Sequence, residues 1–406
     1  MIALRPNRQR SLIAVVQILG LSVWFSAAAV VPNLRADWGF GSTASGWLTT
    51  SVQIGFAAGA VASALLRLAD RITPQHLLAA GAACAAVCTA ALAVLAHGLC
   101  DAIALRFLTG VALAGVYPVG MKLTASWSES ADRGQWFGIL IGSLTLGSAF
   151  PHLISSLGPL PWRAVMAIAA TLSAVGAAIA VMAIVPGPHL DRRPVIPNPR
   201  HLIAMFADRG FRLTNAAYLG HMWELYALWT WLPIFLRAGR QQTSDDGGTS
   251  TAMISFCAIG IAGMAGCLLG GWASDRFGRR AAAVTALVIS AACCVASPFF
   301  FTATTPALVV FLLVWGAAVI ADSGVFSTSL SEIANKSLVG TALTAQTAAG
   351  FLLTIVTIQL VPIAADLLGW QYAFLLLAPG PVIGAGAMAA IGAFQHHQLK
   401  EESHDN

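Results

Sequence analysis

The stretch Gly220–Pro233, GHMWELYALWTWLP, places a carboxylic acid and an imidazole inside a run of mostly apolar residues. Glu224 lies near the middle of that run, and His221 precedes it by three residues, on the same face of a helix. Burial favours the protonated form of a carboxylic acid, so Glu224 is a candidate proton carrier that His221 can assist. The alternative is a hydrogen-bonded pair that only holds helices together.

Two more charged residues interrupt apolar segments. Asp322 is a second candidate for proton or cation binding, and a hydrogen bond to Ser323 is its structural alternative. Arg106 can attract an anionic substrate or couple to a carboxylate. Its alternatives are a fixed ion pair or a side chain that reaches toward the membrane surface.

A binding surface for an uncharged part of a ligand is expected from aromatic and amide side chains. Trp24 and Trp223 occupy corresponding places in two apolar segments, and their rings can stack on a flat substrate. Gln53 and Gln346 would add hydrogen-bonding groups, and Tyr117 precedes a proline that bends its helix. Packing of these aromatic rings against lipid or other helices is the alternative.

The composition is that of a membrane protein. The 406 residues are 57% hydrophobic and only 10% charged, whereas a soluble domain has about 25% charged residues. The seven cysteines fit no zinc spacing, and no phosphate-binding loop of the type G-x-x-x-x-G-K-[ST] is present. We therefore expect neither an enzyme nor an ATP-driven pump, with no cofactor, no metal and no nucleic-acid partner.

Segments of about 20 apolar residues are long enough to cross a membrane as helices. The sequence contains twelve, at 11–32, 43–66, 76–97, 101–125, 135–157, 162–185, 212–237, 250–272, 280–301, 306–329, 338–361 and 369–394. With the N-terminus inside, sixteen Lys and Arg residues fall on the inner side and four on the outer side. This bias predicts that both termini are cytoplasmic.

The two halves of the chain contain corresponding motifs. Asp70-Arg71 follows the second segment, and Asp275-Arg276 follows the eighth. Glycines recur at three- and four-residue spacing in both segments, which lets helices pack closely. This pattern predicts an all-α protein of two six-helix bundles related by a pseudo-two-fold axis, over 1–186 and 212–406, joined by a cytoplasmic linker, 187–211.

The stretch Gly271–Arg280, GWASDRFGRR, resembles the signature of the major facilitator superfamily, residue for residue. The resemblance implies a twelve-helix transporter with its substrate between the bundles, and a latch that favours one conformation. The residues expected in this latch are Gly271, Asp275, Arg276, Gly278 and Arg279, with Asp70 and Arg71 in a degraded first-half copy. Of the glycines, Gly271 is expected to permit a close approach of helices and Gly278 a tight turn.

These features predict a proton-coupled secondary transporter that moves a small organic molecule, such as an organic anion, by alternating access. The alternatives are an efflux antiporter for drugs or metabolites, an uncoupled facilitator and, last, a membrane sensor that binds without transport. Compact loops and short termini favour a bacterial inner membrane, and we expect a monomer in the lipid bilayer whose partners are protons and its substrate.

Overall fold

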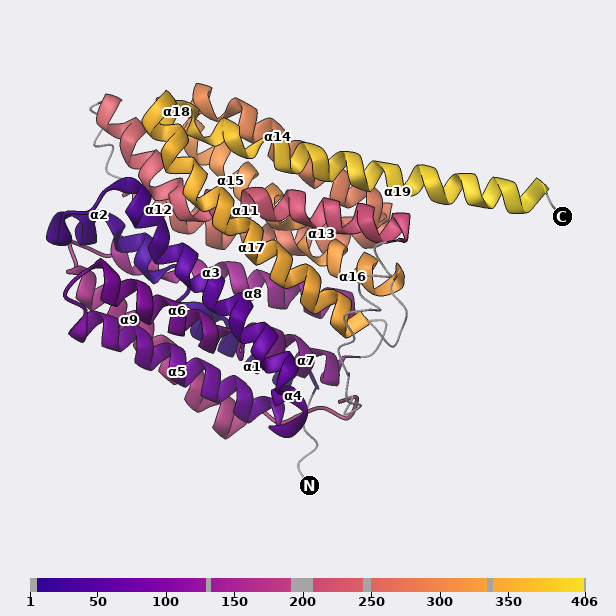
Figure 1. The fold of residues 1–406 in the computed structure, drawn as a ribbon, viewed down its shortest axis with the longest axis horizontal. Helices are drawn as coiled ribbons and strands as arrows, with labels where there is room; N and C mark the ends of the chain where they lie inside the picture. Colours follow the sequence, from indigo (N-terminus) through magenta and orange to yellow (C-terminus); the bar gives the residue numbers. More distant parts are fainter. Residues whose placement is uncertain (1–5, 129–132, 191–206, 244–249, 334–338, 405–406) are drawn as a thin grey trace.

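The structure is a computed structural model that describes residues 6–128, 133–190, 207–243, 250–333 and 339–404. Its elements are helices throughout the described residues (Figure 1). The first half contains α1 (Pro6–Leu21), α2 (Ser26–Trp38), α3 (Ser42–Leu65), α4 (Leu68–Arg71), α5 (Pro74–Leu95), α6 (Leu99–Leu113), α7 (Tyr117–Trp127), α8 (Arg133–Ser156) and α9 (Trp162–Ala183).

The second half begins with the longest helix and again supplies six spans. Its elements are α11 (Arg209–Thr243), α12 (Thr251–Phe256), the π-helix η1 (Cys257–Ala262), α13 (Gly263–Phe277), α14 (Arg279–Phe300), α15 (Thr305–Ala321), α16 (Ser323–Ile333), α17 (Val339–Leu368), α18 (Trp370–Ala373), the 3-10 helix η2 (Phe374–Leu377) and α19 (Pro379–His404). Most of these bounds lie within a few residues of the predicted segments, although α11, α17 and α19 run further.

Eleven helical segments of the described chain are long and apolar enough to cross a membrane. Several are built from two elements, as in the first span, where α1 and α2 follow one another. The remaining span is α11, the seventh in chain order, whose 35 residues include His221, Glu224 and several tryptophans and tyrosines that lower its mean hydropathy. The prediction of twelve spans in an all-α fold is therefore confirmed.

The helices form two bundles that lie against each other (Figure 1). In the first bundle α5 packs on α9 and α3 packs on α6, and in the second α11 packs on α19 and α13 packs on α15. Two seams join the bundles, one between α3 and α17 and the other between α8 and the segment α12–η1–α13. Residues at these seams decide how the halves approach each other.

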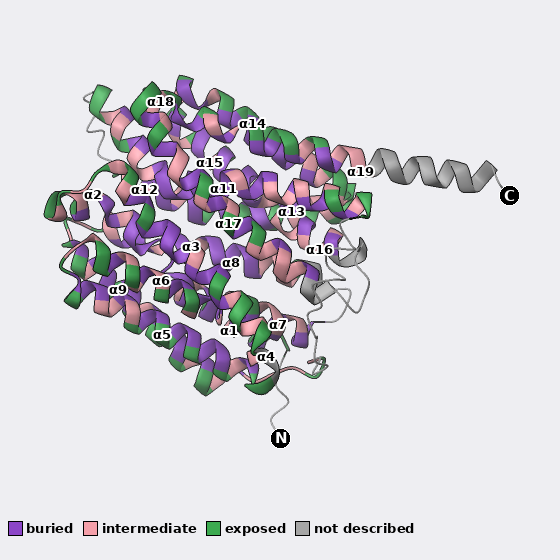
Figure 2. Ribbon diagram, in the orientation of Figure 1, coloured by how far each residue is buried: buried purple, intermediate pink, exposed green. Residues whose placement is uncertain are grey.

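Exposed residues line the outer surface of the bundles (Figure 2), and many large apolar side chains are among the exposed residues. Phe299 is 82% exposed and Val94 is 73% exposed. A surface of this kind is stable where lipid chains surround the protein. The protein is thus a multi-pass membrane protein, and the buried polar residues inside it require an explanation.

Close packing of the spans depends on glycines that face a neighbouring backbone. A Cβ atom on Gly266 or Gly270 would collide with the carbonyl of Ala317 or Ala321 on α15. Gly271 was expected to permit such an approach, and that expectation is wrong, because a Cβ there would meet no heavy atom within 4 Å. The contact uses one face of the helix, and Gly271 lies on another face.

We expect Gly270→Ala to destabilise the protein, because the added methyl overlaps the backbone of α15. Overpacking of this type costs about 1–3 kcal/mol. The adjacent Gly271→Ala is the matched control and leaves the stability unchanged or slightly higher, since alanine favours a helix over glycine. Thermal unfolding of both variants in the same detergent measures the difference. Equal stability of the two variants would contradict the proposed contact.

Candidate functional site

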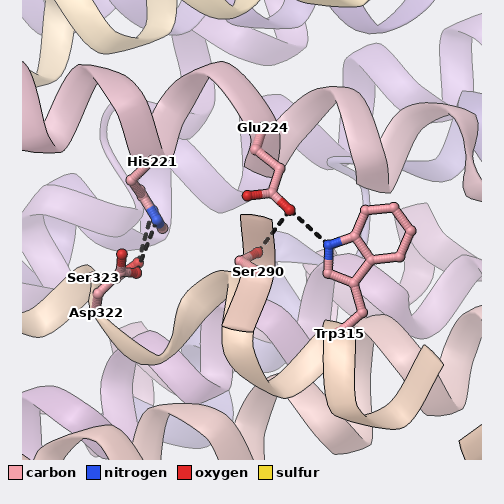
Figure 3. A network of polar contacts seen from close by, with 6 residues as sticks. All are labelled: His221, Glu224, Ser290, Trp315, Asp322 and Ser323. Carbon is pink, nitrogen blue, oxygen red and sulfur yellow. Dashed lines mark hydrogen bonds and ion pairs between the residues drawn. The ribbon is translucent and has the colours of Figure 1, made fainter. Parts of the chain in front are cut away.

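Glu224 lies near the middle of α11 and is only 1% exposed. Its Oε1 atom accepts hydrogen bonds from Ser290 Oγ at 2.7 Å and Trp315 Nε1 at 2.6 Å (Figure 3). Cys294 Sγ lies 3.3 Å from the same oxygen. These donors come from α14 and α15, so the carboxyl group points into the second bundle. No cation is among these contacts, so an ionised Glu224 would be a costly buried charge.

His221 has its own set of partners one helical turn before Glu224. Its Nδ1 atom lies 2.9 Å from Asp322 Oδ1, and its Nε2 atom lies 3.0 Å from Ser323 Oγ (Figure 3). Asp322 occupies the junction between α15 and α16, where the tenth span is interrupted. His221 and Asp322 are 3% and 2% exposed, so the pair is well removed from water.

The three residues expected to handle protons therefore lie in one region of the second bundle, but in two networks. The contacts of His221 run to Asp322 and Ser323, and those of Glu224 run to α14 and α15 (Figure 3). The helical turn that separates the two side chains leaves both on the same side of α11. A proton on one group changes the electrostatic energy of the other, even without a direct hydrogen bond.

Arg106 is fully buried in the first bundle, and its guanidinium group binds protein oxygens. It donates to the carbonyls of Val23 at 2.8 Å and Leu48 at 3.2 Å, and to the Trp24 carbonyl. It also reaches the hydroxyl of Ser26 at 3.2 Å. The carbonyls of residues 23 and 24 are available because the first span is interrupted between α1 and α2. Arg106 therefore cross-links this break to α3.

The first and fourth spans of each bundle are connected through interruptions of this kind. In the first bundle Gln17 Nε2 donates to the carbonyl of Val116, between α6 and α7, at 2.9 Å. In the second bundle His221 reaches the break at Asp322. A freed polar group in a membrane span needs a partner from a neighbouring helix. Gln17 was not predicted, and only its place in an apolar segment signals it.

An aromatic cluster lies between the bundles, near the middle of the spans that carry it. Trp24 from the break in the first span lies 5.0 Å from Phe56 of α3, between ring centroids. From the other bundle, Tyr226 of α11 stacks on Trp24 at 6.0 Å and Phe351 of α17 stacks on it at 5.7 Å. Trp24 thus faces the opposite bundle, where a substrate between the halves would lie. The aromatic rings on the other side of the cluster were not predicted.

Several buried polar groups on the segments that carry this cluster have no hydrogen-bond partner among the described residues. Both amide atoms of Gln53, the indole nitrogen of Trp24 and the amide nitrogen of Gln346 are in this state. Gln53 is fully buried on α3, between Thr50, which bonds Gln359 of α17, and Phe56. Buried polar groups are normally paired, so these groups are suited to a ligand that brings its own donors and acceptors.

Trp223 and Tyr117 lie in different surroundings. The Trp223 indole donates to the Leu376 carbonyl of η2 at 3.0 Å, and its ring lies against Gly380 of α19. Trp223 therefore packs within the second bundle, away from the cluster around Trp24, although the two residues correspond in sequence. Tyr117 begins α7 directly after the break in the fourth span, where the prediction placed a bend, and it packs against the main core.

The residues expected to form a latch are at the membrane surface. Gly278 joins α13 to α14 with φ +87°, a conformation that favours glycine. Asp275, Arg276 and Arg71 are exposed, and Arg279 is half-buried. The side chain of Asp70 lies outside the described residues. In the part of the chain that is described, Asp275 accepts no hydrogen bond, so the latch stays a prediction.

The donors around Glu224 are the functional candidates that reasoning from sequence missed. Ser290, Cys294 and Ser297 recur at spacings of four and three residues, which places them on one face of α14. This polar stripe was a usable signal, since it must turn inward in a membrane. Across the described chain, no group of three His, Cys, Asp or Glu side chains is placed to hold a metal ion.

The arrangement of twelve spans in two bundles around buried polar residues has counterparts among known proteins. The Major Facilitator Superfamily profile matches residues 13–357 and 263–403. The chain therefore belongs to this superfamily of membrane transporters, as the signature near Asp275 predicted.

Two solved structures share the fold over 95% of this chain. The proton:xylose symporter XylE bound to 6-bromo-6-deoxy-D-glucose has a TM-score of 0.74 at 14% identity, and 96% of it is covered. The nucleoside transporter NupG has a TM-score of 0.73 at 15% identity and is covered completely. The niacin transporter NiaP of Acinetobacter baylyi is 31% identical over 144 residues, which span 34% of this chain and about a third of that protein.

Proposed function

We propose that this protein is a proton-coupled secondary transporter that moves a small organic molecule across the membrane by alternating access. The proposal rests above all on Glu224, an acid buried near the centre of a span with no cation among its contacts. An acid in this position is stable when protonated and costly when ionised. Uptake and release of its proton can therefore be coupled to movements that admit water.

His221 and Asp322 extend this role to the interrupted tenth span. Their contact ties α11 to the junction between α15 and α16, a point where a helix can change direction. A change in the charge of either group would alter this link. Glu224 lies one helical turn from His221, so its protonation would change the electrostatic energy of the His221–Asp322 contact. Protonation of Glu224 would in this way alter the contact between α11 and the interrupted tenth span.

The substrate would bind between the bundles, against Trp24, Gln53 and Gln346, where unpaired polar groups adjoin aromatic rings. The guanidinium group of Arg106 is already bound to the Val23 and Trp24 carbonyls at the break in the first span. This favours a substrate recognised by stacking and neutral hydrogen bonds over one recognised by Arg106. The relatives transport niacin, xylose and nucleosides according to their names, which supports a small organic molecule.

An uncoupled facilitator is the second candidate, and one observation favours it. The bonded oxygen of Glu224 faces α14 and α15 inside the second bundle, away from the aromatic cluster. An acid that only joins three helices would have the same contacts. Transport in this case would not respond to a proton gradient, and Glu224→Gln would preserve it. For either function, we propose that the protein lies in a bacterial inner membrane with both termini in the cytoplasm.

The first experiment compares proton binding by the wild type and by Glu224→Gln, in detergent and without ligand. If Glu224 carries the proton, the variant loses about one titrating group between about pH 5 and pH 9. Glutamine keeps an oxygen that can accept from Trp315, so the variant should fold. Asp101→Asn, which changes an exposed acid at the start of α6, is the matched control and should leave this titration unaltered in that range.

An unchanged titration in Glu224→Gln would exclude Glu224 as the proton carrier and direct the same test to Asp322. A lost titration would justify uptake assays under a proton gradient, in which niacin, xylose and a nucleoside are the first substrates. Transport that responds to the gradient in the wild type but not in Glu224→Gln would establish coupling. Gradient-independent transport in both proteins would establish the facilitator.

A further inference from the structure

A groove lies between the bundles on the membrane face opposite the N-terminus, one span away from Pro6. Its cavity volume is about 430 Å³. One wall is the end of α2 with Arg35, followed by Phe40, and the other is the end of α11 with Arg237. Trp370 at the start of α18 contributes an aromatic surface. In Figure 1, α2 and α18 lie at the end away from the C-terminus.

The described lining of the groove is positively charged because each bundle supplies one arginine. Arg35 uses its Nε atom to bind the Phe40 carbonyl at 3.2 Å, which leaves its two terminal nitrogens for other partners. The side chain of Arg237 is exposed and has no hydrogen bond or ion pair with the described residues. No acid belongs to the described lining, and the nearby Asp37 carboxylate accepts the Trp162 indole at 2.7 Å.

The two arginines hold corresponding places in the repeat. Arg35 lies three residues after Pro32, and Arg237 lies four residues after Pro233, each at the outer end of the first span of its bundle. An anion between them would therefore contact both halves at once. Guanidinium groups bind carboxylates and phosphates through paired hydrogen bonds. Phe40 and Trp370 provide faces for an apolar ring beside such an anion.

We propose that this groove is a binding site for a small soluble anion with an apolar body, of the size and chemistry of an aromatic carboxylate. Its volume falls within the range of small-molecule sites, about 300–1,000 Å³. Such a ligand joins the bundles at this face and stabilises the conformation in which the groove is formed. The site is separate from Glu224 and from the aromatic cluster, and its existence does not depend on proton coupling.

The test measures binding of benzoate to the purified full-length protein by equilibrium dialysis, with benzamide as a neutral probe of the same shape. We expect saturable benzoate binding below about 10 mM, and binding of benzamide at least about tenfold weaker. The double variant Arg35→Gln/Arg237→Gln should lose benzoate binding by about tenfold or more, since each charge-assisted contact is removed. Arg163→Gln is the matched control, because Arg163 is exposed and lies over the Trp162 ring.

The Gln53→Leu variant distinguishes benzoate binding in this groove from binding at the substrate site between the bundles. Benzoate binding that survives in Gln53→Leu and in Glu224→Gln, but fails in the double arginine variant, supports the proposal even if transport is not proton-coupled. Binding lost in Gln53→Leu but kept in the double variant overturns it, as does the absence of benzoate binding to the wild type. Tighter binding of phosphatidylglycerol micelles than of benzoate, also dependent on both arginines, would assign the groove to a lipid headgroup and overturn the soluble ligand.

Discussion

The Arg106→Lys variant is expected to be much less stable than the wild type, although it keeps the positive charge. The guanidinium group reaches the carbonyls of Val23 and Trp24 beside the break in the first span, and that of Leu48 on α3. A lysine ammonium is a single point and cannot reproduce this fork. The variant keeps the cost of a buried charge and loses at least two charge-assisted bonds, a penalty of roughly 3–5 kcal/mol.

Thermal unfolding in detergent checks this prediction, with Arg163→Lys as the control for an exposed arginine. The result also decides between two roles of Arg106. If Arg106 mainly attracted an anionic substrate, lysine would preserve the attraction and the stability of the ligand-free protein. Wild-type stability in Arg106→Lys, together with weaker transport of anions, would contradict the structural role and restore the prediction that Arg106 binds substrate.

The second large effect is expected for His221→Phe. This change removes the imidazole that contacts Asp322 at 2.9 Å and leaves the carboxyl group in the interior, 2% exposed. Breaking a buried charged pair from one side costs about 3–5 kcal/mol, mostly because the remaining charge has no partner. If the imidazole is neutral, the cost falls toward that of a buried polar group left without a partner, about 1–3 kcal/mol.

A double-mutant cycle measures this contact. Asp322→Leu alone and His221→Phe alone should each destabilise the protein, whereas the combined variant should recover part of the loss because no unpaired charge remains. Ser323→Ala removes only the bond to His221 Nε2 and should have a smaller effect. Strictly additive losses in the cycle would show that His221 and Asp322 do not interact energetically.

The architecture of this protein could be predicted from sequence because its determinants are local or repeated. The length of each apolar segment decides whether it can span a membrane. The repeated pairs Asp70-Arg71 and Asp275-Arg276 indicate two related halves. The burial of Glu224, His221 and Asp322 could be expected too, because charged groups inside a span usually face the protein interior, whereas for Arg106 a side chain that reaches toward the membrane surface was the alternative. The structure places all four below 4% exposure.

The partners of these residues were decided by the tertiary structure alone. Spacing on α11 places His221 beside Glu224. The packing of α14, α15 and α16 against α11 brings His221 to Asp322, and Glu224 to Ser290 and Trp315. Likewise, Gly270 touches α15 while its neighbour Gly271 does not. The rotation of a helix about its axis depends on the side chains of several neighbours together, and no single segment encodes it.

The same distinction separates Trp24 from Trp223. Their positions in the repeat correspond, yet Trp24 faces the opposite bundle and Trp223 packs against η2 and α19. The break between α1 and α2, held by Arg106, alters the direction of the chain at Trp24, whereas α11 continues through Trp223 without interruption. The sequence by itself determined the spans, the repeat and the places of Glu224 and Asp322 inside the spans. Only the packing of helices from both bundles decided what each charge and each ring contacts, because those contacts depend on the distance and rotation of segments far apart in the chain.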